Sequence, residues 1–531
     1  MNKAMAAVVS ATLALAATAC SGDSGSSSTP GSDEYVDGGT FTAVTSADPG
    51  KFDPATATGT ATNAALAYAY DTLVAMGPDG SAVPVVAKSW EVKPSSVKFN
   101  LRDDVICNDG SKLTATQVAA NFSHLADPKN KSPLLGIYVP VGTKATADDT
   151  AGTVTLNTPK PYGFLLQGAM SVFLVCGKGL TDRKLLERGM VGTGPYALSE
   201  NVPGDHRTYT LRKEYAWGGQ GVTARTKGLP SKIVIRTVAS ESTQLNMMVS
   251  GQANAMSSSG PDRARLERTP GVKVKKIAQG PGQLFLNQGT GRPAADPAVR
   301  KALAQGVNLP ELAKIASSGS GAPQTTLTPI EPRACVYDSV TGNLPAFDQN
   351  AAKATLDAAG WKPGSDGIRE KDGKKLRLRY LYESTEAGAT AAGEYLAAQW
   401  KQLGAHLEMK GVLDSEVDRT LFSAGDWEVV WLPVTVSLPI ELMPFLSRTT
   451  APEGTNFSGI KNAEYVKLAE RATATLGKPG CELWKQAEAA LFKNVDLLPI
   501  VNRSALIGLR KATLQVVGGS IVPTSIRMLK G

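Results

Sequence analysis

Two stretches of strand–helix–strand character, about 140 residues apart, restrict this chain to a small set of folds. In the first, residues 231–238 predict a strand, residues 241–251 a helix that ends at Gly251, and residues 252–256 a short strand. In the second, residues 374–384 and 405–412 predict strands on either side of a helix. Such units place their strands parallel, with the helix covering one face. The pattern predicts an α/β protein with two lobes.

Two apolar stretches are suited to connect these lobes. Residues 280–290 (GPGQLFLNQGT) form a Gly-bounded strand pattern, and residues 496–510 form a second one near the C-terminus. A chain that leaves the first lobe and later returns to it needs two such crossings. We therefore expect a hinge at Gly280–Gly289 and Leu498–Arg503, and a cleft between the lobes.

Local signals identify further elements of the first lobe. Val97, Phe99 and Leu101 alternate with polar residues, as in a half-buried strand. Thr114 and Gln117 fit a capping box at the start of a helix. The basic run from Lys374 to Tyr380 alternates with apolar residues, which indicates a strand with one solvated face.

The N-terminus has the pattern of a bacterial lipoprotein signal. Residues 4–19 are apolar but too few to span a membrane, and they end in small residues before Cys20. The usual box has Leu where this chain has Ala17, and an ordinary secretory signal is the alternative. We expect residues 1–19 to be removed, Cys20 to carry the lipid, and residues 20–37 to form a flexible tether. The protein would then lie on the outer face of the cytoplasmic membrane, on the periplasmic side if there is an outer membrane.

Composition excludes some classes of protein. Apolar residues make up 42% of the chain, which suits a globular body of two or three domains. Without residues 1–19 the chain has 55 basic and 48 acidic side chains, a slight excess that is scattered. This argues against nucleic acid as a partner. No later apolar run is long enough to cross a membrane, so lipid would be the anchor.

Four cysteines follow Cys20: Cys107, Cys176, Cys335 and Cys481. An exported protein meets oxidising conditions, so an even number favours two disulfides, and three pairings are possible. We favour Cys107–Cys176 and Cys335–Cys481, because each pair then lies within one proposed lobe. Free buried thiols are the alternative.

Six blocks, in order, resemble the bacterial extracellular solute-binding proteins of family 5, the oligopeptide, dipeptide and nickel group that serves ABC importers. They are residues 38–58 with their "FDP" turn, 86–122, 191–218 with "VGTGPY", 296–329 with "DPAVRKALAQG", 346–361, and 454–472. In the third block, Gly192 and Gly194 permit a backbone path closed to residues with a Cβ. In the fourth, Asp296 can cap a helix with Pro297 in its first turn, and Val299 and Leu303 would face the core.

The resemblance implies a two-lobed periplasmic-binding-protein-like (type II) α/β fold with an extra domain inserted in the first lobe. We assign residues 38–279 to the first lobe, including an insert at about 72–188, residues 280–492 to the second lobe, and residues 493–531 to the return. The implied protein is a monomer that binds a peptide or peptide-like solute. Its partners would be an ABC permease and ATPases. No catalysis, cofactor or metal is implied.

The ligand site is expected to involve the stretch after Trp431. In peptide-binding relatives this stretch runs Trp-x-Ala-Asp-Tyr, and its aspartate pairs with the α-ammonium group of the peptide. Here Val434 occupies the aspartate position. Either another acid, such as Glu441 or Asp48, reaches the site, or the ligand lacks a free amine. We expect the pocket to be lined by Trp431, Leu432, Pro433, Val434, Thr435, Asn456 and Phe457, facing Thr45, Ser46 and Asp48. Trp431 could instead be a core anchor beneath the cleft.

Two other functions are alternatives. Nickel binding would need His206 of one lobe to meet His406 of the other, and nothing in the spacing of these residues or of His124 favours it. An exported serine enzyme of the penicillin-binding type is suggested only by Ser-x-x-Lys at Ser95–Lys98 and Ser458–Lys461, and no Lys-Thr-Gly follows. We therefore expect a binding protein rather than an enzyme.

Overall fold

The computed structural model describes residues 34–57, 60–260 and 262–530. The signal, Cys20 and most of the predicted tether lie outside the described residues. Residues 35–531 pack as one unit. Within the described ranges, no helix combines the length and apolar character that crossing a bilayer requires.

An eleven-stranded sheet runs through the unit in the order β18-β17-β19-β12-β20-β11-β1-β10-β9-β8, with β13 also paired to β20. We call the part around β17–β19 lobe 2 and the part around β1 and β8–β11 lobe 1. The strands are β1 (Thr40–Thr45), β8 (Tyr196–Val202), β9 (His206–Leu211), β10 (Lys232–Thr237), β11 (Ala255–Ser258), β12 (Val272–Leu286), β13 (Ala322–Pro323), β17 (Arg377–Glu383), β18 (His406–Val412), β19 (Val429–Trp431) and β20 (Leu497–Arg510).

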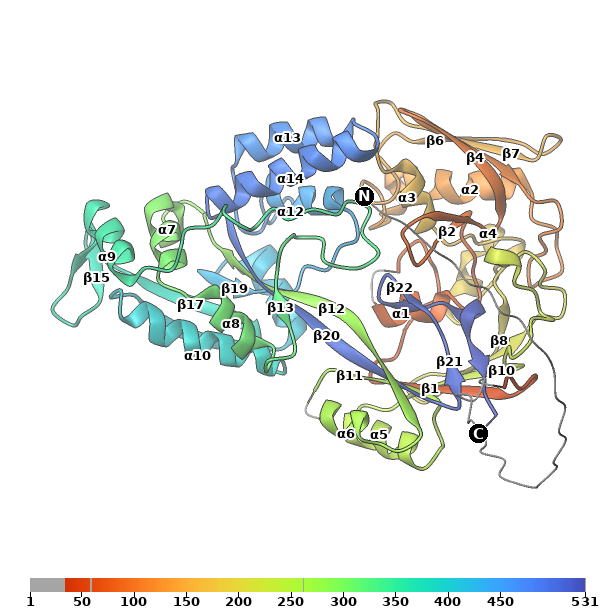
Figure 1. Cartoon of the computed structure of the whole chain (residues 1–531). Helices are drawn as coiled ribbons and strands as arrows, with labels where there is room; N and C mark the ends of the chain where they lie inside the picture. The colour runs from red at the N-terminus through yellow and green to blue at the C-terminus, as the bar shows by residue number, and fades with distance from the viewer. Residues whose placement is uncertain (1–33, 58–59, 261, 531) are drawn as a thin grey trace, which may run out of the picture. The chain divides into compact units, whose positions relative to one another are not determined.

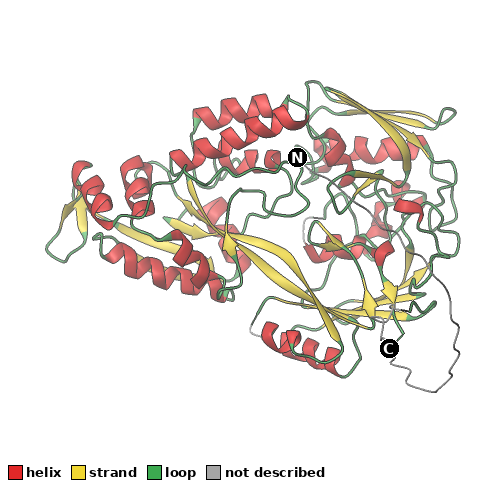
Figure 2. Cartoon of the chain, viewed as in Figure 1, coloured by secondary structure: helices red, strands yellow, loops and turns green. Residues whose placement is uncertain are grey.

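The two apolar stretches predicted to connect the lobes are β12 and β20. They pair antiparallel along most of their length, from Val272 opposite Arg510 to Phe285 opposite Leu497. β12 pairs with β19 of lobe 2 at one end, and β20 pairs with β11 of lobe 1 at the other. Both long strands therefore run from one lobe into the other (Figures 1 and 2). The predicted boundaries near residues 280 and 493 stay predictions, since these strands belong to both lobes.

Lobe 2 covers both faces of its strands with helices. One face packs Leu284, Val429 and Trp431 into a cluster with Leu303 and Trp400. The other face packs Phe285 and Val430 with Trp484. The helices of this lobe are α7 (Pro297–Gln305), α8 (Leu309–Ala316), α9 (Gln349–Ala358), α10 (Ala387–Lys401), α11 (Asp414–Arg419), α12 (Met443–Ser447), α13 (Ala463–Thr473) and α14 (Gly477–Lys493).

The segment inserted into lobe 1 has its own four-stranded sheet, in the order β4-β5-β7-β6. Its core is continuous with one face of lobe 2, since Phe164 packs on Trp484 with ring centroids 6.3 Å apart. The insert therefore contacts both lobes. Its elements are β2 (Val74–Met76), β3 (Ala82–Pro84), β4 (Ala87–Lys93), β5 (Ser96–Leu101), α2 (Ala115–Ala126), β6 (Lys144–Asp148), β7 (Thr153–Asn157), α3 (Leu165–Met170) and α4 (Lys178–Thr181).

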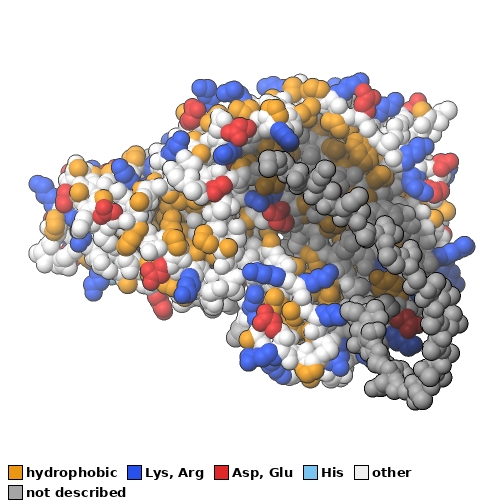
Figure 3. All heavy atoms as spheres, in the orientation of Figure 1, with side chains coloured by type: hydrophobic (Ala, Val, Ile, Leu, Met, Phe, Trp, Pro, Cys, Tyr) orange, Lys and Arg blue, Asp and Glu red, His pale blue; other side chains and the backbone are white. Residues whose placement is uncertain are grey.

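Lobe 1 also contains helices α1 (Thr60–Leu66), α5 (Glu241–Val249) and α6 (Arg263–Glu267), and the C-terminal strands β21 (Ala512–Thr513), β22 (Val516–Val517), β23 (Ser520–Ile521) and β24 (Arg527–Met528). Short strands β14 (Lys362–Pro363), β15 (Arg369–Lys371) and β16 (Lys374–Lys375) form a small sheet in lobe 2. On the face seen in Figure 3, acidic and basic side chains are interspersed over both lobes.

Most local signals produce the expected elements. Thr114 caps α2 by accepting a hydrogen bond from the Gln117 N–H at 3.2 Å, but the side-chain oxygen of Gln117 is buried without a partner. Asp296 caps α7, and Val299 and Leu303 are fully buried. The second strand–helix–strand unit forms the adjacent parallel pair β17 and β18. The first differs from the prediction, because β1 lies between β10 and β11 and pairs parallel with both.

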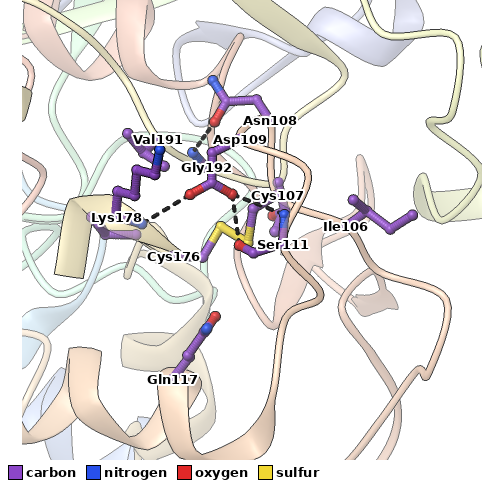
Figure 4. Close-up of a disulfide and its surroundings, with 12 residues drawn as sticks. Ile106, Cys107, Asn108, Asp109, Ser111, Gln117, Cys176, Lys178, Val191 and Gly192 are labelled. Carbon is purple, nitrogen blue, oxygen red and sulfur yellow. Dashed lines mark hydrogen bonds between the residues drawn. A yellow bond between two sulfur atoms is a disulfide. The ribbon is translucent and has the colours of Figure 1, made fainter. Parts of the chain in front are cut away.

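The structure contains the disulfides Cys107–Cys176 and Cys335–Cys481, the pairings that the sequence favours. Figure 4 shows that Asp109 supports the first of them. Its carboxylate accepts hydrogen bonds from the Lys178 N–H at 2.9 Å and the Ser111 hydroxyl at 2.6 Å. A Cβ on Gly177, which follows Cys176, would lie 2.0 Å from that carboxylate, and Gly177 has a φ of +51°, so another residue here would be strained and would displace Asp109.

The "VGTGPY" block lies very close to the backbone of the segment around Ala69. A Cβ on Gly192 would lie 2.4 Å from the Ala69 carbonyl oxygen, and a Cβ on Gly194 would lie 2.4 Å from the Ala69 carbonyl carbon. Gly192 also exchanges hydrogen bonds with Asn108 next to the disulfide. Both glycines therefore have a structural role in lobe 1.

Candidate ligand-binding site

The crossing of β12 and β20 is irregular at the position where the hinge was predicted. The pairing register shifts between Ala278 and Pro281 and again between Gly282 and Gln283. Arg503 of β20 donates from Nε to the Gly280 carbonyl at 3.0 Å. This irregular stretch joins the lobes, and a hinge role for it stays a prediction.

Trp431 lies in the core of lobe 2. Its side chain is 1% exposed, and its Nε1 donates to Glu386 Oε1 at 2.9 Å. Glu386 also accepts from Arg503 of β20. A Cβ on Gly282 would lie 2.3 Å from the Trp431 ring, so the glycine makes room for the indole. Trp431 therefore is the core anchor that the sequence allowed as an alternative, tied through Glu386 to the crossing strands.

The next residues continue along the edge of β12 toward the crossing. The Leu432 N–H donates to the Gln283 carbonyl at 3.0 Å. A Cβ on Gly280 would lie 2.7 Å from Thr435 Oγ1 and 3.5 Å from Pro433 Cβ. Leu432, Pro433 and Val434 are half-buried and Thr435 is exposed. This segment is the candidate wall that lobe 2 contributes, and it is almost free of charge.

Asn456 and Phe457 are not brought together with Trp431. Asn456 is 1% exposed, and its amide bonds the backbone of Arg448 and Ile460. Phe457 packs on Phe285, on the opposite face of β12 from the Trp431 cluster. Both residues line a separate pocket of about 320 Å³ within lobe 2. Their side chains stabilise that lobe, and the resemblance alone had linked them to the cleft.

The lobe 1 candidates end strand β1. The Thr45 carbonyl accepts from the Val238 N–H, and Ser46 is exposed. Asp48 accepts hydrogen bonds from Arg207 Nη2 at 2.6 Å, the Gly204 N–H at 2.6 Å and the Gly50 N–H at 2.8 Å. Burial opposes ionisation, but Arg207 and these N–H groups outweigh it and lower the pKa of Asp48 to about 2. Asp48 is thus an ionised partner of Arg207 at the β8–β9 turn.

Glu441, the other acid considered for the site, is buried between lobe 2 and the insert. Its side chain is 4% exposed, Oε2 accepts from the Ser437 N–H at 3.1 Å, and Oε1 has no hydrogen-bond partner. Burial raises the pKa values of Tyr138 and Tyr162 of the insert, and the charge of the neighbouring Glu441 raises them further. Burial raises the pKa of Glu441 to about 7. The sequence showed this acid but not its burial.

The histidines considered for nickel lie far apart in the sheet. His206 is in β9, near one edge, and contacts Asp205 and Glu200, whereas His406 is in β18 at the other edge. Across the described ranges, no group of three or more His, Cys, Asp or Glu side chains could hold a metal ion.

The Glu386–Arg503 pair was not singled out from the sequence, although Arg503 falls in the predicted hinge. The Gly-Pro-Gly motif at residues 280–282 was the available signal, because glycines allow a close approach of the backbone. It does not indicate which side chains lie beside it. A two-lobed α/β body joined by two crossing strands is the type II fold of solute-binding proteins.

Comparison with known proteins identifies the family. The model for bacterial extracellular solute-binding proteins, family 5 Middle, matches residues 81–457. The nickel-binding periplasmic protein of Escherichia coli strain K12 is 26% identical over 363 residues, 66% of this chain and 67% of that protein. The periplasmic murein peptide-binding protein MppA of the same strain is 25% identical over 495 residues, 85% of this chain and 86% of that protein.

A solved structure shows the same fold over almost the whole chain. It is a substrate binding protein from Microbacterium hydrocarbonoxydans complexed with 4-hydroxybenzoate hydrazide, with 25% identity, a TM-score of 0.72, and coverage of 92% of this chain and 99% of that one. The chain belongs to the bacterial extracellular solute-binding proteins of family 5, which confirms the resemblance and the two-lobed fold. It is the extracytoplasmic solute-binding component of an ABC importer. Its relatives are transport proteins rather than enzymes.

Proposed function

We propose that this protein captures a peptide or peptide-like solute that has no free amine at the Val434 position, and delivers it to an ABC permease. The solute would bind between the lobes and favour their closure about β12 and β20, because it contacts both lobes only when they approach. The family and the murein peptide-binding relative support a peptide.

The state of the acids named as candidates supports a ligand without a free amine. Asp48 is already paired with Arg207, and Glu386 with Arg503. Glu441 is buried, with a pKa that burial raises. Val434, at the position where peptide-binding relatives have aspartate, is half-buried and apolar. An ammonium group buried here without a carboxylate partner would be disfavoured by several kcal/mol.

A neutral solute that is not a peptide is the second candidate. The Microbacterium protein is complexed with a small aromatic hydrazide, which has no α-ammonium group. The uncharged segment Leu432–Thr435 suits such a ligand equally well. Nickel, as in the Escherichia coli relative, is the weakest candidate because His206 and His406 lie near opposite edges of the sheet.

The experiment begins with mass spectrometry of any solute that co-purifies with the protein. Calorimetry then compares matched peptides with free and acetylated N-termini, on the native protein and on Val434→Asp. We expect acetylated peptides to bind at least as well as free ones, and Val434→Asp to improve binding of free-amine peptides at least tenfold. Val249→Asp, at an exposed position in lobe 1, is the matched control. A tenfold preference for free amines that Val434→Asp leaves unchanged would contradict the proposal.

We further propose that Cys20 carries a lipid that retains the protein beside its permease, as a monomer. The apolar run ending at Cys20 and the polar stretch after it support this. Incorporation of a labelled fatty acid, lost in Cys20→Ser, is the expected result. A mature chain that starts elsewhere and remains unlabelled would contradict it.

Acylation by a labelled β-lactam would revive the serine-enzyme alternative. Of its two Ser-x-x-Lys serines, Ser458 is fully buried and its hydroxyl has no hydrogen-bond partner. We expect no acylation of the folded protein.

A further inference from the structure

Lobe 1 contains a pocket of about 480 Å³ that the predicted site does not include. This volume is within the range of pockets that hold small molecules. Its walls come from β2 and β3 of the insert, the segment after α1, and the C-terminal segment around β22 and β23. Aromatic rings of Tyr70, Phe173 and Tyr215 line it together with apolar side chains such as Val83 and Val517.

The charged side chains in the described walls of this pocket already have partners. Asp71 accepts from Trp217 Nε1 at 2.9 Å and from the Tyr215 hydroxyl at 3.3 Å. Lys275 Nζ donates to the Leu514 carbonyl. Arg527 donates to the Thr524 and Ile526 carbonyls, each at 2.8 Å. A charged ligand would have to displace one of these contacts, so the walls favour a neutral molecule with an aromatic ring.

A segment of lobe 2 reaches the rim of this lobe 1 pocket. We call residues 324–348 the strap. It is fastened to α14 by the Cys335–Cys481 disulfide. It is also fastened by Glu488, whose carboxylate accepts from the Tyr337 hydroxyl at 2.7 Å and from the Leu327 N–H at 3.1 Å. The strap therefore moves with lobe 2.

The strap contacts two turns that border the pocket. The Gly518 N–H, in the turn between β22 and β23, donates to the Glu331 carbonyl at 3.1 Å. A Cβ on Gly80, in the turn between β2 and β3, would lie 3.4 Å from Pro332 Cβ. Figure 1 locates both hairpins and the β13 strand from which the strap continues. The strap therefore connects lobe 2 to the two hairpins that border the pocket, so movement of lobe 2 would displace these hairpins or break their contacts with the strap.

We propose that this pocket is a second solute-binding site, for neutral molecules with an aromatic ring, and that the strap is its lid. The site is separate from the Val434 segment and does not depend on the ligand proposed there. Its occupancy would nevertheless be linked to the position of the lobes, because the lid is fixed to lobe 2.

The site is tested with N-acetyl-L-tyrosinamide, a neutral aromatic probe, by calorimetry and saturation-transfer NMR on the full folded protein. Ala75→Phe places a ring in the pocket, since Ala75 is a half-buried wall residue on β2. We expect this variant to weaken probe binding at least tenfold. Ala358→Phe, the same substitution at an exposed position of α9, should leave binding unchanged. Probe binding that Ala75→Phe leaves intact would overturn the proposal.

The lid is tested by replacing Cys335 and Cys481 together by serine, which removes the disulfide that fastens the strap to α14. We expect exchange of the probe to become at least threefold faster, whereas the matched removal of Cys107 and Cys176, which are not in the strap, should leave the exchange rate unchanged. Equal exchange in the native protein and the Cys335→Ser, Cys481→Ser variant would overturn the role of the strap. Probe binding that responds to Val434→Asp and not to Ala75→Phe would place the probe at the Val434 segment, which overturns the second site and leaves the proposed function standing.

Discussion

Replacing Glu441 by glutamine should make the protein more stable at pH 8 and change little at pH 4.5. Glu441 is 4% exposed, and one carboxylate oxygen has no hydrogen-bond partner. Burial raises its pKa to about 7, from an ordinary value of 4.5. Between pH 4.5 and about pH 7, Glu441 of the folded protein keeps a proton that the unfolded chain has released. The stability of the protein therefore falls as pH rises through this range.

The size of the effect follows from the same two values. Each pH unit between them corresponds to about 1.4 kcal/mol, so ionised Glu441 lowers the free energy of unfolding by about 3 kcal/mol above pH 7. Glutamine resembles the protonated acid in shape and remains neutral. The gain in Glu441→Gln should therefore be near zero at pH 4.5 and grow to about 3 kcal/mol at pH 8.

Urea unfolding at several pH values measures this difference directly. Asp71, Glu386, Glu488 and Asp496 also have raised pKa values, so the comparison is variant against native protein at each pH. Glu394→Gln, at an exposed position on α10, is the control and should show no such trend. A stability difference that is independent of pH, or a variant less stable at pH 8, would refute the reasoning.

Three further perturbations test the packing described above. Gly282→Ala should lower the unfolding free energy by about 1–3 kcal/mol, because the added Cβ clashes with the Trp431 ring. In a double-mutant cycle, Trp431→Phe should recover part of this loss, and strictly additive effects would show that the two residues do not interact. Asp48→Asn should lower the unfolding free energy by about 1–2 kcal/mol at pH 7, after allowance for its partial exposure. This cost should shrink to a small fraction as pH falls from about 4 to 2, because native Asp48 is then increasingly protonated, and urea unfolding at pH 7 and pH 2 would show it. Replacing Cys107 and Cys176 together by serine should lower the unfolding free energy by about 4 kcal/mol in the chain-entropy model. A melting temperature that does not fall in calorimetry would contradict this.

Sequence patterns were sufficient to predict elements whose formation depends on residues close together in the chain. Alternation identified β5 and β17, and Asp296 followed by proline identified the start of α7. Sequence reasoning did not reveal that β1 separates β10 from β11, because strand order depends on pairing between distant segments. The periodicity of a segment does not indicate which distant segment it pairs with.

The candidate site was predicted less well than the fold for the same reason. Asp48 is a surface acid by sequence, yet Arg207, 159 residues away, holds it. Trp431 could be a pocket wall or a core anchor until Gly282 and Glu386 are seen beside it. The absence of an aspartate at Val434 was visible from the sequence, but the engagement of the other acids depends on the folded chain.

The position of β20 in the middle of the sheet sets the order in which the protein can fold. β11, β12 and β13 all pair with β20, which is the last long strand to be synthesised and exported. Lobe 2 is almost complete before β20 appears, whereas the sheet of lobe 1 must wait for it with β11 unpaired along one edge. Unpaired strand edges join readily to other chains. During export, the exposed edge of β11 is therefore the segment that most needs protection, and a chain truncated before residue 497 should aggregate.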